Sequence, residues 1–285
     1  MEKRTEKNME EVKKEMNTKI INSLRNNRDL IWIFTKREIE GKYKGSSLGI
    51  LWSVINPIVM LCVYTIVFSK IFKAKWGVID NDGIDDPVAF ALNLFAGLIV
   101  FNIFAECAAK STLLIRSNPN YVKKIVFPLE VLGLATTGCA LFHGTVNLMI
   151  LISVKFVLEG SIAPALIYLP ILWGSYIITI SGMVWILSIL GVLIKDVNQI
   201  VNSVISVMMF MSPVFYPTEM VPIEMRWVAN LNPLAYIINE TRAIVIDGTI
   251  PSIDKLIVFA ILSILIGEIC LRLLKRKQCL LGDRL

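Results

Sequence analysis

The hydrophobic residues of this 285-residue chain come in long blocks, whereas a soluble domain spaces them at helical or strand periods. A bilayer core about 30 Å thick is crossed by roughly 20 apolar residues, each adding about 1.5 Å to a helix. Several blocks meet that length. The pattern predicts an all-α membrane protein with six spans, near residues 48–72, 88–109, 129–158, 166–194, 197–216 and 256–274.

Residues 28–46 form a different pattern immediately before the first span. Apolar side chains, among them Ile31, Phe34 and Ile39, are mixed with basic ones, and such an amphipathic helix lies in the plane of the membrane surface. It is either a plain anchor or a lever that also touches a cytoplasmic partner, and the direct join to the first span favours the lever. The preceding leader, residues 1–27, is dense in Lys and Glu and predicts a solvated helix or disorder.

The composition and the charge distribution agree with a membrane protein. Apolar residues make up 55% of the chain and charged residues 18%, against about 25% charged in an ordinary soluble domain. Most of the 29 Lys and Arg residues lie in the leader, in the loop between spans two and three, and in the C-terminal tail. The opposite loops are acidic. By the positive-inside rule we expect both termini in the cytoplasm and the chain in the cytoplasmic membrane.

The loop at residues 110–128 holds a second candidate lever on the cytoplasmic side. Its Asn118-Pro119 pair predicts the start of a short helix, and Pro128 predicts its end. Between them a small apolar knob has basic neighbours, which a passive connector would not need. We therefore expect a docking helix for another protein, made of Asn118, Pro119, Tyr121, Val122, Lys123, Lys124 and Ile125.

Residues 220–246 are apolar enough to resemble a further span. However, a charge such as Arg226 or Arg242 costs about 2.5–3.5 kcal/mol at the centre of a membrane helix. We expect instead two short re-entrant helices that dip into the outer leaflet, where surrounding protein satisfies the freed backbone groups. They break at Asn232-Pro233. The candidate residues of this outer region are Arg226, Trp227, Asn232, Pro233 and Arg242.

Candidate catalytic chemistry is sparse. His143 is the only histidine and sits in an apolar stretch, which favours packing over catalysis. The segment GKYKGSS at 41–47 lacks the G-x-x-x-x-G-K-[ST] order and the preceding strand of a phosphate-binding loop. The five cysteines form no CxxC pair and are expected to be small apolar fillers. We expect no enzymatic activity, metal or cofactor on this chain, so nucleotide energy must enter through a second polypeptide.

Two further groups of side chains have mainly structural interpretations. Charged residues near the span ends are spaced for pairing within one helix, as in Glu106–Lys110, Lys155–Glu159 and Glu268–Arg272. Aromatic rings either pack against lipid and form interfacial belts, or line a pathway on which sugar rings stack. The candidate channel aromatics are Trp52, Tyr64, Phe68, Phe95, Phe101, Phe104, Phe210 and Tyr216.

Three ordered segments carry a family resemblance: KREIEGKYKGSSLGILWSVINPIVMLCVYTIVF, IRSNPNYVKKIVFPLE, and SPVFYPTEMVP followed by LNPLAY and Arg242. From about Arg28 to the C-terminus, the chain resembles the permease subunits of ABC transporters that export bacterial surface polysaccharides. That group includes exporters of O-antigen, capsule and teichoic acid. The leader has no clear counterpart in the family.

The resemblance implies a homodimer in the bacterial cytoplasmic membrane, with two copies of a separate ATPase that bind ATP and Mg. It implies that residues 28–46 form a gate helix at the cytoplasmic entrance and that residues 47–285 form the six-span permease domain. Within that domain, 110–128 would hold the coupling helix and 220–246 the outer gate. The implied substrate is a glycan on a lipid diphosphate. Either the diphosphate or anionic lipid would meet the entrance residues Lys36, Arg37, Lys42, Tyr43 and Lys44.

Three other functions remain open from the sequence. A drug or small-lipid permease of the same broad class would have a lateral apolar portal, whereas a long aromatic channel favours a glycan. A membrane-embedded transferase acting on lipid-linked sugars would need a catalytic His or carboxylate at the membrane surface. A stand-alone secondary transporter would need an unpaired charge in the middle of a span, and the predicted spans carry none.

Overall fold

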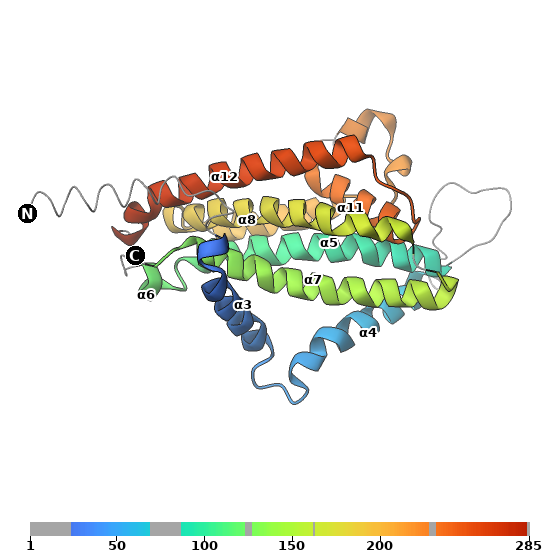
Figure 1. Ribbon diagram of the computed structural model, residues 1–285, viewed down its shortest axis with the longest axis horizontal. Helices are drawn as coiled ribbons and strands as arrows, with labels where there is room; N and C mark the ends of the chain where they lie inside the picture. The colour runs from blue at the N-terminus through green and yellow to red at the C-terminus, as the bar shows by residue number, and fades with distance from the viewer. Residues whose placement is uncertain (1–23, 69–86, 123–126, 162, 228–231, 284–285) are drawn as a thin grey trace, which may run out of the picture.

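The computed structural model describes five stretches of the chain: residues 24–68, 87–122, 127–161, 163–227 and 232–283. These residues form helices and connecting turns, and no strand occurs among them. The all-α prediction is therefore confirmed for the described part of the chain. Four long helices run side by side along the length of the molecule (Figure 1): α5 (Pro87–Leu114), α7 (Glu130–Glu159), α8 (Leu169–Leu193) and α12 (Ile253–Asp283).

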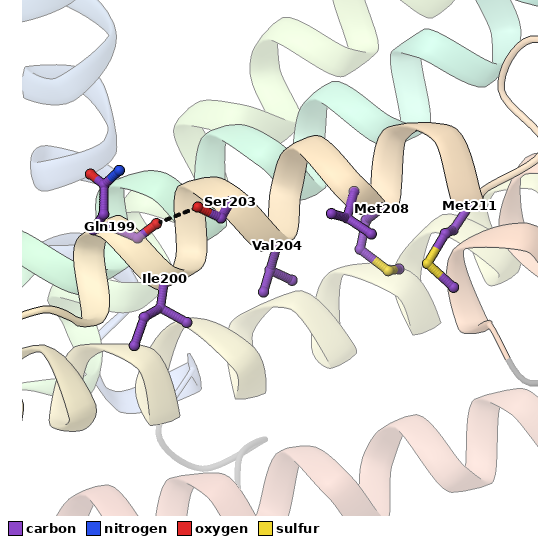
Figure 2. A pocket seen from close by; sticks show the side chains of 7 residues that line it. Gln199, Ile200, Ser203, Val204, Met208 and Met211 are labelled. Atoms are coloured by element: carbon purple, nitrogen blue, oxygen red, sulfur yellow. Dashed lines mark hydrogen bonds between the residues drawn. The ribbon is translucent and has the colours of Figure 1, made fainter.

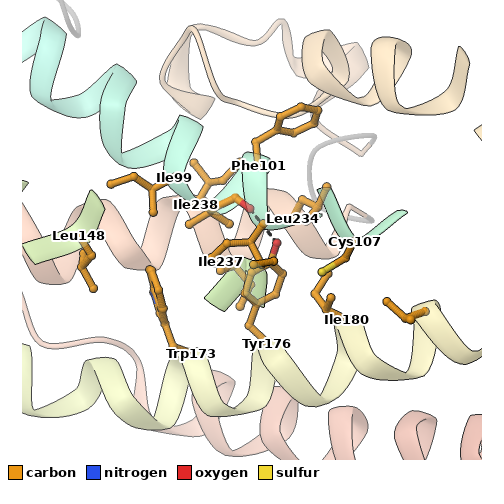
Figure 3. Close-up of a cluster of buried hydrophobic side chains, with 14 of the residues drawn as sticks. Ile99, Phe101, Cys107, Leu148, Trp173, Tyr176, Ile180, Leu234, Ile237 and Ile238 are labelled. Carbon is orange, nitrogen blue, oxygen red and sulfur yellow. Dashed lines mark hydrogen bonds between the residues drawn. The ribbon is translucent and has the colours of Figure 1, made fainter. Parts of the chain in front are cut away.

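Helix α5 forms the centre of the bundle, with α7 and α8 packed against it and α12 packed against α8. Of the 18-residue apolar segment within it that is long enough to span a membrane, 72% is buried. Figure 3 shows Trp173 and Tyr176 pointing from α8 into a cluster that includes Ile99 of α5 and Ile237 of α11 (Pro233–Val245). The Tyr176 hydroxyl donates a hydrogen bond of 2.8 Å to the carbonyl of Val100. The buried tyrosine hydroxyl thereby has a hydrogen-bond partner, and its ring still packs in the apolar core.

Five described helical stretches have the length and apolar composition of membrane spans: Gly49–Ile66, Val88–Leu114, Glu130–Glu159, Pro164–Leu193 and Ile253–Gln278. The predicted span at 197–216 is helical only over α9 (Val197–Met211), which has 15 residues. At about 1.5 Å per residue this helix is roughly 22 Å long. It ends where Ser212 adopts an extended conformation and Pro213 brings no backbone N–H.

The predicted interfacial helix is α3 (Arg28–Tyr43), which packs on α7 and slants away from the long helices in Figure 1. A turn follows, in which Gly45 has φ 89° and Gly49 has φ 54°, a left-handed region that favours glycine. The turn leads through the 3-10 segment η1 (Gly49–Leu51) into α4 (Trp52–Ile66). Only 11% of this first membrane-length stretch is buried, so α4 lies at the edge of the bundle.

Short elements occupy the two ends of the bundle. Helix α6 (Pro119–Val122) begins at the predicted proline and lies near the C-terminal end of α12 in Figure 1. At the other end, α9 is followed by two 3-10 turns, η4 (Thr218–Met220) and η5 (Ile223–Met225), and then by α11 (Pro233–Val245). The predicted start of a helix at Pro233 is confirmed. Where the first of the two outer helices was expected, from residue 220 onward, the structure has these 3-10 turns. Residues 228–231 lie outside the described part of the chain.

Helix α11 is held by its N-terminal cap and by its packing. The Asn232 side chain accepts a hydrogen bond of 3.0 Å from the Leu234 backbone N–H, and Pro233 occupies the first helical position. The helix packs on α5, α8 and the 3-10 segment η3 (Pro164–Tyr168). Eight of its 13 residues are buried. This short helix is thus largely enclosed by the rest of the chain.

Candidate functional site

A cavity of about 620 Å³ lies between α3, α4, α5 and α7. We call it the gate pocket. Its walls combine the end of α3, the start of α4 and the middle of α5 and α7, so four segments far apart in sequence are needed to build it. The residues that matter most for its chemistry are Lys42, Tyr43, Trp52, Glu106, Lys110 and His143.

One carboxylate holds the charged wall of the gate pocket together. Glu106 Oε1 lies 3.1 Å from Lys42 Nζ of α3 and 2.9 Å from Lys110 Nζ, one turn further along α5. His143 Nδ1 of α7 lies 3.7 Å from Glu106 Oε2 and 3.5 Å from Lys42 Nζ. Three helices therefore meet at Glu106, whose side chain is 20% exposed.

A second carboxylate fixes the middle of α3 against α7. Thr136 Oγ1 donates a hydrogen bond of 3.0 Å to Glu38 Oε1, and Lys110 Nζ lies 3.9 Å from Glu38 Oε2. Burial raises the pKa of Glu38 above its ordinary value, although Lys110 acts in the opposite direction. The two helices approach closely because Gly138 has no side chain, and an added Cβ there would lie 2.9 Å from the Thr35 hydroxyl.

The gate pocket also contains three potential metal ligands. The ligand atoms of Glu106, Cys139 and His143 all lie within 4.8 Å of one another. However, the Lys42 ammonium already binds Glu106 and approaches the His143 ring. The positive charge beside these two ligand atoms therefore comes from a lysine side chain. The arrangement is therefore one of ion pairs between helices.

The sequence predicted a buried packing role for His143, and the structure adds contacts with charged side chains. Its side chain is 12% exposed, but the Nδ1 edge of the ring faces Glu106 and Lys42. The ring of its sequence neighbour Phe142 packs edge-on against the His143 ring, with 5.5 Å between centroids. A helical spacing of four from Cys139 was the available signal for a shared face, whereas the partner on α5 could not be read from the sequence.

Tyr121 joins the predicted docking helix to α3. Its hydroxyl accepts a hydrogen bond of 3.0 Å from Arg37 Nη1, and its ring packs edge-on against Phe34 with 5.3 Å between centroids. It also packs on Phe127, 4.8 Å away, whose carbonyl accepts a hydrogen bond from Gln278 of α12. The ring of Tyr121 is thus engaged within the chain and connects α6, α3 and α12.

The other predicted docking residues are placed only in part. The Asn118 side chain donates a hydrogen bond of 2.9 Å to the carbonyl of Leu114, and the Tyr121 backbone N–H donates to the carbonyl of Asn118. The helix thus begins at Pro119, as predicted. The side chain of Val122 and the residues Lys123, Lys124 and Ile125 lie outside the described part of the chain.

The entrance residues of α3 have separate environments. Lys36 Nζ lies 3.8 Å from Glu40 Oε1 on the exposed face of the helix, while Arg37 binds Tyr121. Lys42 and Tyr43 line the gate pocket, and the Tyr43 ring meets His143 edge-on at 5.8 Å. Lys44 is exposed just after the helix ends.

The candidate channel aromatics do not share one surface. Trp52 lines the gate pocket, and Phe68 stacks on Phe90. Phe95 and Phe101 are buried in the core. The remaining candidates are half-buried or exposed: Tyr64, Phe104, Phe210 and Tyr216, the last of which donates a hydrogen bond from its hydroxyl to the Phe210 carbonyl.

At the other end of the bundle, Arg242 of α11 is buried and binds three backbone carbonyls. Its guanidinium donates to Asn93 at 2.8 Å, to Pro213 at 2.5 Å and to Val214 at 2.7 Å. The Pro213 and Val214 carbonyls belong to the segment just beyond the end of α9. Gly97 of α5 makes room for the guanidinium, since an added Cβ would lie 2.6 Å from Arg242 Nη2.

The other outer residues are arranged around this contact. Asn232 donates a hydrogen bond of 2.9 Å from Nδ2 to the Ser212 hydroxyl, beside the carbonyls that Arg242 binds. Arg226 is exposed and donates to the carbonyls of Glu219 and Val221. Trp227 is 62% exposed. Of the predicted outer residues, Asn232 and Arg242 are therefore buried, whereas Arg226 and Trp227 are exposed. Pro233 begins helix α11.

Helix α9 presents a groove on its outer face. The groove has a volume of about 510 Å³ and is mostly apolar, and Figure 2 shows its side chains projecting from one side of the helix. The Ser203 hydroxyl there donates to the carbonyl of Gln199 at 3.1 Å. Gln199, Asn202, Ser203 and Ser206 are all exposed. The helix therefore carries polar side chains on a face that the rest of this chain leaves uncovered.

The three helical ion pairs predicted from the spacing are confirmed. Glu106 pairs with Lys110 at 2.9 Å, Lys155 with Glu159 at 2.7 Å, and Glu268 with Arg272 at 4.0 Å. Two of them have additional partners that the spacing does not reveal. Lys155 also donates to the carbonyl of Ile246 beyond α11, and Glu106 binds Lys42.

The fold and the site define the class of this protein as a polytopic helical membrane protein, with a charged pocket between α3 and three of the long apolar helices. The chain belongs to the ABC-2 type transporter family, whose profile matches residues 29–246. This membership and the relatives below confirm the resemblance drawn from the sequence.

Three relatives illustrate the similarity. The O-antigen export system permease protein RfbA of Klebsiella pneumoniae is 28% identical over 228 residues, which cover 78% of this chain and 82% of the relative. The protein of that name from Myxococcus xanthus is 22% identical over 250 residues, covering 87% and 92%. The polysialic acid transport protein KpsM of Escherichia coli is 23% identical over 237 residues, covering 81% and 88%.

Proposed function

We propose that this chain is the permease subunit of an ABC exporter that moves a lipid-linked polysaccharide across the bacterial cytoplasmic membrane. The polymer is of the O-antigen, capsule or teichoic acid kind, and a separate ATPase subunit supplies the energy. The observation that carries the proposal is the contact of Tyr121 with Phe34 and Arg37. It connects the short helix α6 to the helix that closes the gate pocket.

The contact provides a mechanical route. Helix α6 lies at the end of the bundle, in a position where a partner protein can push on it (Figure 1). Packed rings and a hydrogen bond transmit displacement because protein interiors resist compression. A shift of α6 would therefore move α3, and with it one wall of the gate pocket. In this proposal ATP and Mg bind to the partner, and the chain itself catalyses no reaction.

For the topology we propose six crossings with both termini in the cytoplasm. Five membrane-length helices support this directly, and α9 together with the extended segment after it forms the fifth crossing. Helix α11 then re-enters the outer leaflet without crossing it. Its burial against α5 and α8, and the hydrogen bonds of Arg242, support this placement, because a buried charge in the membrane needs protein partners.

We propose further that two copies of the chain form the exporter. The outer face of α9 supports this, since lipid tails offer no hydrogen-bond partner to the side-chain amides of Gln199 and Asn202, which are exposed there. A second copy, or a polar channel between two copies, provides those partners. The weakly covered helix α4 supplies additional apolar surface for the same contact.

The substrate class rests on the relatives' names and on the chemistry of the gate pocket. Lys42 and Lys110 suit a diphosphate, because lysine binds phosphate as a point charge. Trp52 in the same pocket offers a flat face for a sugar ring. A permease for drugs or small lipids, the alternative considered from the sequence, is less well supported because such cargo has no need of this charged wall.

The proposal is tested by separating ATP hydrolysis from export. The chain is co-expressed with candidate ABC ATPases of the same genome, and the complex is isolated through a tag on the chain. Tyr121→Ala should leave ATPase binding and hydrolysis within about twofold but reduce polysaccharide at the cell surface at least tenfold, because the connection to α3 is cut.

Tyr168→Ala is the matched control, since Tyr168 is a half-buried tyrosine in η3 at the opposite end of α7. It should leave both ATP hydrolysis and export near their original levels. Failure to recover any ABC ATPase with the tagged chain would refute the proposed function. Unchanged export in the Tyr121→Ala variant would refute the mechanical route.

A further inference from the structure

We propose that Glu106 occupies, within the closed protein, the place of the substrate's phosphate, and that it holds Lys42 until a phosphate group displaces it. The inference rests on the proposed function for the identity of the natural ligand. It assigns to Glu106 a regulatory role that its helical pairing with Lys110 does not explain. The Lys42–Glu106 ion pair is then a latch between α3 and α5 that an anionic head group opens.

Lys42 is the basic residue of α3 that reaches into the bundle. It lies in the last turn of α3, and its ammonium crosses to α5, where it lies 3.1 and 3.3 Å from the two oxygens of Glu106. Lys36 is engaged with Glu40 on the exposed face, and Arg37 binds Tyr121. The C-terminal end of α3 is thus held to α5 through Lys42.

Glu106 is suited to releasing Lys42. Its other partners, Lys110 on the same helix and His143 on α7, stay in place when α3 moves. Release therefore leaves no unpaired buried carboxylate, which would otherwise oppose opening strongly. The Lys42 side chain is 43% exposed at the mouth of the gate pocket, so an incoming group can reach it.

A phosphate or diphosphate is a stronger partner for Lys42 than a single carboxylate. It carries more negative charge and more acceptor oxygens, and hydrogen bonds between charged groups are among the strongest in proteins. The gate pocket has room for such a group, and Asn102 and Asn147 line it with amide donors. Lys110, which also lines the pocket, provides a second cation for the same ligand.

The latch would make opening depend on the substrate. While Lys42 is bound to Glu106, α3 is held in its middle, through Phe34 and Arg37 on Tyr121, and at its C-terminal end, through Glu106. Once a phosphate takes Lys42, the C-terminal end is free. Movement that arrives through Tyr121 can then swing this end away from the gate pocket while the Glu38 contact keeps the middle of α3 on α7, so an empty exporter stays closed.

The test uses the purified full chain in detergent, with inorganic pyrophosphate as the probe and calorimetry as the binding measurement. Glu106→Gln should bind pyrophosphate at least tenfold more tightly than the original chain, because the internal competitor is removed. The double variant Glu106→Gln/Lys42→Gln should lose that gain. Hydrogen exchange of residues 39–43 should become at least threefold faster in Glu106→Gln.

Lys42→Gln keeps the Glu106 carboxylate and breaks the same ion pair by removing the ammonium group. It should therefore speed the exchange of residues 39–43 as much as Glu106→Gln does, without tighter pyrophosphate binding. The two substitutions together should speed exchange no further than either alone, since both break one ion pair. This variant keeps the inference testable if Glu106→Gln folds poorly.

Glu40→Gln is the matched control, because Glu40 is an exposed carboxylate of α3 paired with Lys36. It should change neither binding nor exchange at residues 39–43. The inference is overturned if Glu106→Gln binds pyrophosphate no more tightly than the original chain, or if the gain survives Lys42→Gln. Loss of ATPase association or of export, with the pyrophosphate competition intact, would refute the proposed function and uphold the latch.

Discussion

The protein holds charge inside its helical bundle in two places, and the two are built differently. Arg242, near the end that holds α11, is 4% exposed and donates to three backbone carbonyls. Glu106, in the gate pocket, is 20% exposed and binds side chains of α3, α5 and α7. Backbone carbonyls cannot leave without unfolding a segment, whereas side chains can exchange partners. The first contact therefore stabilises a fixed structure, and the second allows movement.

The difference follows from what each contact must join. Arg242 connects α11, α5 and the turn after α9, and Gly97 admits its guanidinium between them. Glu106 connects helices whose relative position must change if α3 is a gate. Partial exposure to water also weakens ion pairs at such a site. The fixed contact and the exchangeable one thus lie in opposite halves of α5.

The largest effect should come from removing the buried guanidinium. Arg242→Met keeps a long apolar side chain but leaves up to three carbonyls without their donor, at about 1–3 kcal/mol for each buried group. We expect the free energy of unfolding to fall by about 3 kcal/mol or more. The measurement is reversible denaturation in detergent, followed by helical circular dichroism.

Arg226→Met provides the matched control, because Arg226 also donates to two backbone carbonyls but is exposed. Its loss should cost less than about 1 kcal/mol, since water replaces the missing donor. Equal losses in the two variants would contradict the distinction between a fixed buried contact and an exposed one.

A smaller effect is expected from filling the space beside Arg242. In Gly97→Ala the new Cβ would lie 2.6 Å from Arg242 Nη2 and 3.2 Å from the carbonyl oxygen of Val214, so these groups must shift. Overpacking of this kind costs about 1–3 kcal/mol, measured by the same denaturation. Combined with Arg242→Met, the loss should be less than additive, because the guanidinium that meets the new methyl group is gone.

The control for this substitution is Gly174→Ala on α8, where an added Cβ has no heavy atom within 4 Å among the described residues. It should leave stability unchanged or raise it slightly, because alanine favours a helix. A loss in Gly174→Ala as large as that in Gly97→Ala would show that the close approach of Arg242 is not the cause.

The smallest effect concerns pH at the junction of α3 and α7. Burial raises the pKa of Glu38, so the folded protein binds this proton more tightly than the unfolded chain does. The resulting stability is present below the ordinary value of 4.5 and is lost as the pH rises through the higher folded pKa. Glu38→Gln should remove this dependence, a change of about 1 kcal/mol or less. Denaturation between pH 4.5 and 7.5 measures it, and an unchanged slope would contradict the assignment.

Local features of the sequence predicted much of the fold. The apolar blocks located the membrane-length helices, and Pro119 and Pro233 marked the starts of helices. The helical ion pairs followed from a spacing of four. All of these depend on neighbours within one turn of helix, whose geometry is the same wherever the helix lies.

The partners across helices were decided only by the tertiary structure. Arg242 meets a carbonyl 149 positions away, Lys42 meets Glu106 at a separation of 64, and Tyr121 turns its ring toward α3. No local periodicity encodes which faces of two helices touch, because that choice depends on how side chains of all the helices pack at once. The sequence by itself thus determined which segments are long and apolar enough to span a membrane. Packing determined that Arg242 binds backbone carbonyls, whereas Glu106 binds side chains that can exchange partners.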